Sequence, residues 1–500
     1  MPSRTDTFPN TYPSHEPADL QDVTDVTHIG SWWKFATTLL IVAAAVQVAD
    51  TTKPIARVSL ALLQRGLPLT DHAAAVHAAS RADDVKILAL LGAAGADFGA
   101  PDAGGDSALH TAAAAGAAGA AAFLIANGVH VDTQGRAGPP LAVALEAEHL
   151  EVARVLLAHG ADPNVMIGRE RRPAPVQVAL TGDVRKMKLL LGLGIPPDVT
   201  GADGLTALAH AVSRNDVPMA QALLEAGATP QAGTAGPDRS LLEQAIRVGR
   251  RDMVELLLAH GADVSALSRE GQPLLPLAVA LGRINIAAAL LDAGADVDTE
   301  LAPLPSEQFL ALMPGRYARF YLTRDEGMTP LTVAVLRADL EMTRLLVARG
   351  ASTGPTRGRF KYPLGLAADR GDIPMMQVLI GRDPEEAAVT RRIVVSLSAQ
   401  QATLYEHGQR TLQTSVSTGK AGFQTPPGDY VITSKHRFWR STIYPADMPY
   451  FMRLSGSEMG LHAGVVPRQP ASHGCIRVPP AAAVALFQRM RLGDPVAVVR

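Results

Sequence analysis

Two kinds of hydrophobic pattern divide the chain. From about residue 56 to 385, apolar residues recur at intervals of three and four within short segments, as at Val152, Val155 and Leu156, which share one face of a helix. After about residue 386 the pattern changes to alternating β-branched and polar residues, which is typical of strands. The pattern therefore predicts a helical region followed by a mostly β domain.

The helical region has a regular period. Short apolar helices end at a glycine and a small loop, and from Gly95 to Gly294 successive glycines are 33, 32, 34, 33, 34 and 33 residues apart, which is the signature of a repeat protein. We expect each of these glycines to adopt the left-handed conformation that ends a helix, and each unit to contain two short antiparallel helices. The series consists of Gly66, Gly95, Gly128, Gly160, Gly194, Gly227, Gly261, Gly294, Gly350 and Gly381.

The repeated unit resembles the ankyrin repeat. The turn Thr329-Pro330-Leu331, where Pro presets the start of a helix, and the recurring Gly-Ala-Asp loops carry this resemblance, which covers roughly two thirds of the chain. It implies nine or ten units and an extended concave surface for a protein partner that the sequence does not identify. We expect structural hydrogen bonds, and no catalysis, from the histidines of the array, namely His110, His159, His210 and His260.

The regular spacing fails once. Gly294 and Gly350 are 56 residues apart, about one repeat plus 23 residues, and the additional segment lies near 301–324. Two interpretations stay open: a docking loop that reaches the enzyme domain or a ligand, and a helical insertion that packs on its own array. The segment carries the aromatic residues Phe309, Tyr317, Phe320 and Tyr321.

The alternating segments of the C-terminal region predict strands and one helix. The sequence Thr-Pro-Pro-Gly-Asp at 425–429 is a turn, so a strand begins at Tyr430. We predict a helix over 480–490 and strands over 392–398, 402–406, 411–417, 430–435, 450–454, 459–462 and 495–499.

The only cysteine of the chain, Cys475, lies thirteen positions after His462. A thiolate is a strong nucleophile, and an imidazole beside it can take the thiol proton and later protonate a leaving amine. Thirteen extended residues would span about 43 Å, so the chain must fold back between the two side chains to bring them together. Backbone N–H groups around Gly474 and Cys475 are the expected donors to a developing oxyanion.

The motif around this cysteine carries a second resemblance. The sequence Leu-His-Ala-Gly at 461–464, followed by Ser-His-Gly-Cys-Ile-Arg-Val at 472–478, is similar to the L,D-transpeptidase catalytic domain of the YkuD type, an enzyme of bacterial cell walls. The resemblance extends over some 110 residues in the order of the family. Its upstream parts are segments 418–420, 425–430 and 448–454.

This resemblance implies a reaction and a set of site residues. The implied substrate is a peptidoglycan stem peptide, cleaved after its third residue, a diamino acid such as meso-diaminopimelate, with release of the terminal D-Ala. The resulting thioester passes to an amine of another stem to form a 3-3 cross-link, to a lipoprotein lysine, or to water, and the acceptor stays open. No metal or other cofactor is implied. By the resemblance Cys475 is the nucleophile and His462 the base, supported by Ser472, His473, Gly474 and Arg477.

Two of the supporting residues have alternative explanations. His473 either orients the substrate or the loop, or makes a purely structural hydrogen bond. Arg477 either holds a substrate carboxylate or pairs with a buried acid of the fold.

Two rival functions compete with the transpeptidase. His462, His473 and Cys475 are ligand types that zinc accepts, but a His-x-Cys spacing brings neighbouring side chains together with poor geometry, and no carboxylate stands nearby to orient them. In the other alternative the protein is a scaffold, with the repeats as its binding part and an inactive C-terminal domain that only binds the wall. The intact pair of Cys475 and His462 argues against this scaffold.

Composition and the N-terminal segment complete the prediction. With 46 basic and 48 acidic side chains, the chain has no basic field that would favour nucleic acid as a partner. Residues 1–30 are polar and predicted to be disordered, and an apolar stretch that begins at Trp32 spans about 27 Å as a helix, close to the hydrocarbon thickness of a bilayer. We expect an uncleaved anchor helix at 31–50, with a buried core helix and a cleaved signal peptide as alternatives.

The predicted fold class is therefore a multidomain protein. It combines a single N-terminal transmembrane helix, an α-solenoid of ankyrin-like repeats over 56–385 and a mostly β L,D-transpeptidase-like domain over 390–500. Charged residues flank the apolar stretch on both sides and set no orientation. The expected location, anchored in the inner membrane with the catalytic domain in the periplasm, follows from the implied substrate alone.

Overall fold

The computed structural model describes residues 72–500 except 232–239, 325–326, 355–361, 388–389, 442–445 and 468. The chain divides into two compact units, Met1–Ala161 and Asp162–Arg500. The expected disordered segment 1–30, the expected anchor helix 31–50 and Gly66 lie outside the described residues. Within the described ranges, no helix has both the length and the apolar character that a membrane span requires.

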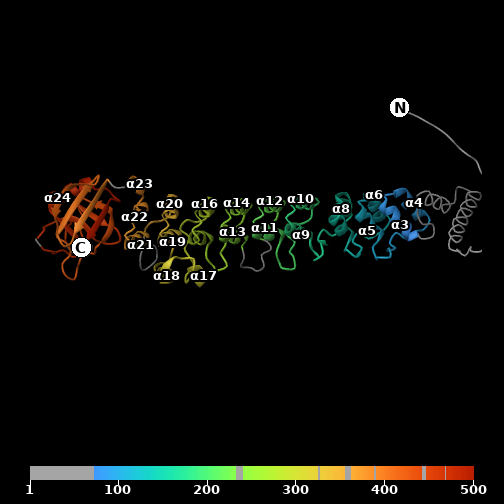
Figure 1. Cartoon of the computed structure of the whole chain (residues 1–500), viewed down its shortest axis with the longest axis horizontal. Helices are drawn as coiled ribbons and strands as arrows, with labels where there is room; N and C mark the ends of the chain where they lie inside the picture. Colours follow the sequence, from blue (N-terminus) through green and yellow to red (C-terminus); the bar gives the residue numbers. More distant parts are fainter. Residues whose placement is uncertain are drawn as a thin grey trace, which may run out of the picture. The chain divides into compact units, whose positions relative to one another are not determined.

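Paired short helices make up the described part of the first unit (Figure 1). Their apolar faces are built largely from alanine and leucine, which are good helix formers and are fully buried at Leu109, Leu124 and Leu156. Ala153 is buried beside Val152 and Leu156, whereas the predicted stripe residue Val155 is only half-buried. The helices are α3 (His72–Arg81), α4 (Val85–Ala93), α5 (Ala108–Ala115), α6 (Ala118–Ala126), α7 (Pro140–Glu146) and α8 (Leu150–Ala158).

The second unit continues the same pairing and ends in a sheet (Figure 1). A two-stranded ribbon of β1 (Met166–Ile167) and β2 (Arg172–Pro173) precedes its first helix. The paired helices of this unit are α9 (Ala174–Thr181), α10 (Val184–Gly192), α11 (Ala207–Arg214), α12 (Val217–Glu225), α13 (Leu241–Val248), α14 (Arg251–Ala259), α15 (Leu274–Ala280), α16 (Ile284–Asp292), α19 (Pro330–Arg337), α20 (Leu340–Ala348), α21 (Pro363–Asp369) and α22 (Ile373–Leu379), followed by the short α23 (Pro384–Ala387).

The helix ends follow the predicted glycine rule. Every described glycine of the repeat series, from Gly95 to Gly381, has a positive φ between 76° and 92°, the left-handed conformation that only glycine adopts without strain. Thr329 caps α19 and Pro330 is its first residue, as the Thr-Pro-Leu turn predicted. A second capping device was not predicted: an aspartate side chain accepts from the backbone at the start of the second helix of several units. These caps are Asp84, Asp183, Asp216, Asp339 and Asp372.

Two of the array histidines are held by hydrogen bonds or charge contacts near the helix starts. In the first unit, His110 contacts the Ser107 hydroxyl through Nδ1 (2.8 Å) and the Gly138 carbonyl through Nε2 (2.9 Å). In the second unit, Nε2 of His210 lies 3.3 Å from a carboxylate oxygen of Asp203. His159 and His260 stand at helix C-caps, where Nδ1 of His159 donates to the Val155 carbonyl. These contacts are structural.

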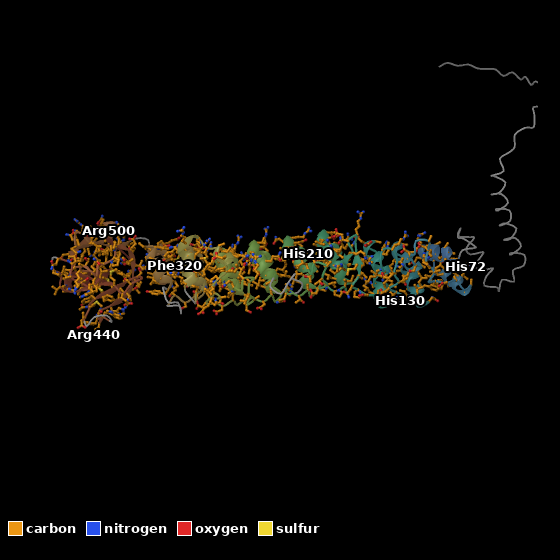
Figure 2. The ribbon with its side chains drawn as sticks, turned by 90° about the horizontal axis from the view of Figure 1, so that it is seen from below. His72, His130, His210, Phe320, Arg440 and Arg500 are labelled. Carbon is orange, nitrogen blue, oxygen red and sulfur yellow. The ribbon has the colours of Figure 1, made fainter. Side chains whose placement is uncertain are left out.

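The inserted segment forms two helices, α17 (Glu307–Leu310) and α18 (Gly315–Arg324), next to α19 (Figure 1). Phe309 is fully buried, the Leu301 N–H donates to the Met328 carbonyl (2.8 Å), and Arg337 of α19 donates to the Leu312 carbonyl (3.0 Å). These contacts favour the interpretation of a helical insertion that packs on its own array. Phe320, labelled in Figure 2, stays 44% exposed.

One eight-stranded sheet forms the C-terminal domain, in the order β5-β4-β3-β10-β6-β7-β8-β9. All predicted strands are present, and the parallel pairs are β3 with β10 and β8 with β9. The last strand of the sheet was not predicted. The strands are β3 (Arg391–Ser396), β4 (Gln401–Glu406), β5 (Gln409–Ser415), β6 (Gly428–His436), β7 (Phe451–Leu454), β8 (Gly460–Ala463), β9 (Ile476–Val478) and β10 (Pro495–Val499), with helix α24 (Pro480–Arg489).

The second unit includes contacts between the last repeat and this sheet. The Gln377 side-chain amide of α22 donates to the Gly493 carbonyl (3.0 Å), and this bond is buried. Arg382, just after α22, lies 3.3 Å from Asp494, which Arg391 at the start of β3 also contacts at 3.2 Å. Asp494 is almost fully buried, so polar and charged groups join the repeat to the domain.

Candidate active site

The pairing of β8 with β9 brings the predicted catalytic residues to one face of the sheet. In this parallel ladder His462 is level with Arg477, and Leu461 and Ala463 are level with Ile476 and Val478. The latter four side chains belong to the hydrophobic core beneath α24. Because side chains alternate between the two faces of a strand, His462 and Arg477 point to the opposite face, together with Cys475, which lies two positions before Arg477.

A cavity of about 290 Å³ opens on this face. His462 and Cys475 both line it, so the fold brings the expected base and nucleophile to one pocket. Between these two described side chains the structure has no direct hydrogen bond, a feature common in free enzymes, whose catalytic contacts tighten when substrate binds. The remaining lining residues are Trp439, Ser441, Ala446, Met448, Glu458, Met459, Ser472, His473, Gly474 and Arg477.

His462 is buried and held in one orientation. Its Nδ1 lies 2.9 Å from the carbonyl oxygen of Ala463. A carbonyl only accepts, so Nδ1 carries the proton and Nε2 is the basic nitrogen. Burial lowers the pKa of His462 below its ordinary value, and the positive charge of Arg477 adds to this effect. The imidazole is therefore neutral at neutral pH and able to accept a proton.

Cys475 is half-buried, and its environment acts on the thiol in two directions. Burial raises the pKa of Cys475 above its ordinary value. The backbone N–H of Gly460 donates to the sulfur, and the guanidinium groups of Arg477 and Arg453 add positive potential, so these three groups lower the pKa and stabilise a thiolate once it forms. Gly460 was not predicted as a site residue, because nothing in its sequence distinguishes it from an ordinary strand glycine.

Ser472 shapes the turn before Cys475, the expected nucleophile. Its hydroxyl donates to the Cys475 carbonyl and accepts from the Gly474 N–H, which lies 3.2 Å away. Ser472 is 1% exposed and its hydroxyl is used in these two bonds, so its role is to support the loop, although it lies at the cavity wall. The Gly474 N–H is thus already engaged, whereas no described residue accepts from the Cys475 N–H. Of the two expected oxyanion donors, the Cys475 amide is the one that is available.

The other two supporting residues lie toward the cavity. The exposed His473 ring makes an edge contact with the ring of Phe423, with centroids 4.8 Å apart. Arg477 lines the cavity, and no described carboxylate forms an ion pair with it. This arrangement favours the interpretation in which Arg477 binds a substrate carboxylate.

A neighbouring segment, the brace loop (residues 417–425), is hydrogen-bonded to the turn around Cys475 (residues 471–477), which is the predicted catalytic turn. Ser417 exchanges two backbone hydrogen bonds with Arg477, and the Thr418 carbonyl accepts from the N–H groups of Ala471 and Ser472. The Lys420 N–H donates to the Ser472 carbonyl at 3.0 Å. In the sequence, this loop carries only a family resemblance, at segments 418–420 and 425–430, and no predicted role.

The donor set of the cavity bears on the rival metal site. Among the described residues, no three His, Cys, Asp or Glu side chains converge as ligands of one metal ion would. The cavity instead places the Cys475 thiol near the neutral His462 imidazole and the Arg477 guanidinium, which are groups of nucleophilic acyl chemistry. His473 and the carboxylate of Glu458, which the sequence did not place near the motif, also line it.

Comparison with known proteins agrees with both resemblances. Residues 390–498 match the model of the YkuD family, the L,D-transpeptidase catalytic domain, and residues 72–167 and 176–268 match ankyrin repeats. The chain thus carries an L,D-transpeptidase-type domain and an ankyrin repeat region.

Individual relatives cover parts of the chain. An ankyrin repeat-containing protein of Treponema pallidum (strain Nichols) is 34% identical over 95 residues, which are 19% of this chain and 32% of that protein. Among solved structures, L,D-transpeptidase 1 of Mycobacterium tuberculosis is 27% identical, with 22% of this chain and 62% of that chain covered and a TM-score of 0.20. An ankyrin repeat domain of Acinetobacter baumannii AYE is 29% identical, with 38% and 98% covered and a TM-score of 0.31. This chain covers less than two thirds of the length of the Treponema pallidum protein and of L,D-transpeptidase 1.

Proposed function

We propose that the C-terminal domain is a cysteine-dependent L,D-transpeptidase that acts on peptidoglycan stem peptides. The observation that carries the proposal is the placement of His462 and Cys475 on one face of the sheet and in one cavity, with Nδ1 of the imidazole engaged by the Ala463 carbonyl. An imidazole in this tautomer presents Nε2 as the general base, and a half-buried thiol with donors around its sulfur serves as the nucleophile.

In the proposed acylation, Nε2 of His462 takes the proton of the Cys475 thiol as the sulfur attacks the carbonyl carbon of the third stem residue. The carbonyl oxygen becomes an oxyanion, which accepts a hydrogen bond from the Cys475 N–H. When the tetrahedral intermediate collapses, the C–N bond to the terminal D-Ala breaks. The imidazolium gives its proton to that leaving amine, and a thioester on Cys475 remains.

In the second half of the proposed reaction, an acceptor amine attacks the thioester carbonyl. His462 takes a proton from the amine, the C–S bond breaks, and the thiol is protonated again. With the side-chain amine of another stem the product is a 3-3 cross-link. Attachment to a lipoprotein lysine and hydrolysis by water follow the same steps with another acceptor.

Recognition of the donor stem rests on charged groups of the cavity. Arg477 binds a carboxylate of the substrate, and Glu458, whose side chain is paired with Arg453 at 2.9 Å, offers a carboxylate to an ammonium group. A diamino acid at the third position presents such an ammonium. His473 lines the cavity, and its ring contacts the exposed ring of Phe423, so these two rings are proposed to contact the stem.

The proposed location follows from this substrate. Stem peptides lie outside the cytoplasmic membrane, so the catalytic domain works in the periplasm, with residues 31–50 as its anchor in the inner membrane. The ankyrin repeats bind a protein partner that recruits the enzyme or positions it at the wall. Reporter enzymes fused to either end of the chain test the orientation, and a cytoplasmic C-terminus would contradict it.

Product analysis of muropeptides tests the proposed activity. Wild-type protein incubated with disaccharide tetrapeptides is expected to release D-Ala and to form 3-3 linked dimers, acylated lysine or tripeptides, according to the acceptor. Cys475→Ala is expected to do none of these. The scaffold alternative predicts no D-Ala release by wild-type protein under conditions in which a control transpeptidase is active.

A further inference from the structure

We infer that Thr425 is a positioning residue for the proposed acylation, because its hydroxyl orients the peptide group that supplies the oxyanion donor. This inference rests on the proposed function of Cys475 as an acylated nucleophile. Thr425 lies in the brace loop, 49 positions before Gly474, and is 2% exposed. Its side chain does not line the cavity and acts only through the backbone of the catalytic turn.

Two hydrogen bonds fix the Thr425 hydroxyl. The Gly419 N–H donates to Oγ1 at 2.9 Å, and Oγ1 lies 2.8 Å from the carbonyl oxygen of Gly474. A carbonyl only accepts, so the hydroxyl proton points to Gly474, while a lone pair of Oγ1 receives the Gly419 N–H. The hydroxyl therefore has one preferred rotation and holds the Gly474 carbonyl from one side.

The position of the Gly474 carbonyl determines where the next N–H points. In a planar trans peptide the C=O of one residue and the N–H of the next point in opposite directions. Thr425 holds the Gly474 oxygen on its own side, so the Cys475 N–H points away from Thr425. This is the N–H for which no described residue supplies an acceptor, and both Gly474 and Cys475 line the cavity.

The Gly474 peptide needs such a restraint. Gly474 has φ +113°, a region in which glycine is free to rotate and other residues are strained. Without a hydrogen-bond partner for the Gly474 carbonyl, the peptide plane between Gly474 and Cys475 could rotate, and the Cys475 N–H would then no longer point toward the oxyanion. The Ser472 hydroxyl restrains the groups on either side, the Gly474 N–H and the Cys475 carbonyl, and Thr425 restrains the peptide between them.

The brace loop is built to hold Thr425 in place. A Cβ atom on Gly419 would overlap the Phe423 carbonyl oxygen and crowd the Thr425 backbone nitrogen, so only glycine permits this close return of the loop. The loop is joined to the catalytic turn by the bonds of Ser417, Thr418 and Lys420. Thr425 thus reaches the Gly474 carbonyl from a fixed support.

Two reactions of the Cys475 sulfur distinguish a positioning role of Thr425 from a general effect of its substitution on folding. Acylation by a carbapenem passes through an oxyanion and needs the Cys475 N–H, whereas alkylation by iodoacetamide occurs at a saturated carbon and forms no oxyanion. Both modify only Cys475, the single cysteine of the chain. The ratio of the two rate constants, measured by intact mass on the full-length protein, therefore reports the oxyanion donor.

For Thr425→Val we expect the acylation rate to fall about tenfold to a hundredfold. This loss is smaller than the loss caused by complete removal of an oxyanion donor, because the Cys475 N–H is misoriented but still present. The alkylation rate is expected to stay close to that of wild type. Thr425→Ser, which retains the hydroxyl, is expected to restore the ratio. Thr418→Val is the matched control, since Thr418 is equally buried in the same loop but its hydroxyl accepts from Gln400 and does not contact Gly474. Its ratio is expected to equal that of wild type.

Three results would overturn the inference: a wild-type ratio in Thr425→Val, an equal loss of acylation and alkylation in that variant, or the same change in ratio in Thr418→Val. If Thr425→Val does not fold, as judged by circular dichroism, Thr425→Ala removes the same hydroxyl with less steric change and is subject to the same criteria. A wild-type protein that is alkylated but never acylated would refute the proposed function itself, and the inference with it.

Discussion

The Nδ1 nitrogen of His462 donates a hydrogen bond of 2.9 Å to the carbonyl oxygen of Ala463, the residue that follows it on β8. This bond uses the nitrogen that could otherwise compete as a base, and the strand fixes the ring. The proposed catalytic imidazole is thus oriented by its own backbone, and no other described side chain forms a hydrogen bond with it. Its state of protonation then controls how the activity depends on pH.

The acid limb of the pH profile is expected to lie below the ordinary histidine pKa. Burial lowers the pKa of His462, so the imidazole stays neutral, and able to act as a base, to a lower pH than a free histidine. We expect kcat/KM for D-Ala release to be level at neutral pH and to fall only below about pH 6.5. A decline that begins well above this value would show that the imidazole is protonated more easily than its burial allows.

The pKa of the Cys475 thiol is shifted upward, whereas the pKa of His462 is shifted downward. Burial raises the pKa of Cys475 above its ordinary value, so the free enzyme holds a neutral thiol at neutral pH. The rate of alkylation by iodoacetamide should therefore still be rising at pH 9, later than the rate for N-acetylcysteine in the same buffers. An alkylation rate that has already reached its plateau at pH 7 would indicate a resting thiolate–imidazolium pair instead.

Removal of the Glu458 charge is expected to weaken substrate binding more than catalysis. Glu458 is exposed at the cavity and pairs with Arg453. An exposed ion pair contributes up to about 1 kcal/mol, so Glu458→Gln should raise KM for stems with a diamino acid by roughly fivefold and leave kcat nearly unchanged. Steady-state kinetics with a stem whose third residue lacks the side-chain amine is the control. An equal effect of the substitution on both substrates would argue against an ammonium contact.

The buried Asp494 is expected to be important for the stability of the domain. It contacts Arg382 and Arg391 and accepts from the Arg491 N–H at 2.7 Å, so Asp494→Ala leaves two partly buried guanidinium groups without their partner. We expect the free energy of unfolding of the C-terminal domain, measured by urea denaturation of the full chain, to fall by about 3 kcal/mol.

A nearby exposed acid provides the control for this stability prediction. Asp383 contacts Arg344 at 3.5 Å, and its side chain is half exposed. Asp383→Ala should change the free energy of unfolding by less than about 1 kcal/mol. Equal losses in Asp383→Ala and Asp494→Ala would mean that burial of the Asp494 network contributes nothing.

Local sequence rules predicted the parts of the fold that depend on neighbouring residues. The left-handed conformation of Gly160 and the start of α19 at Pro330 follow from backbone geometry alone. Strands such as β4 and β10 follow from alternation over five or more residues. In the same way, the motif that contains Cys475 could be recognised because its residues are contiguous.

The remaining features depend on contacts between distant segments. Strand β9 has only three residues, too few for a period, and it forms because Leu461 of β8 lies beside Ile476. The contact of the Gly460 N–H with the sulfur and the bond from Thr425 to Gly474 arise from this pairing and from the brace loop. Local patterns assign no such role to Gly460 or Thr425, because the partners of these residues are 15 and 49 positions away in the sequence.

The central claim is that the Cys475 sulfur carries the stem peptide as a thioester. Intact-protein mass spectrometry of the full chain, quenched in acid shortly after mixing with a tetrapeptide stem, tests it directly. We predict a mass increase equal to the stem without its terminal D-Ala, located on Cys475 by peptide mapping and absent from Cys475→Ala. Release of D-Ala with no adduct at any quench time, or with equal rates in Cys475→Ala and wild type, would contradict the account.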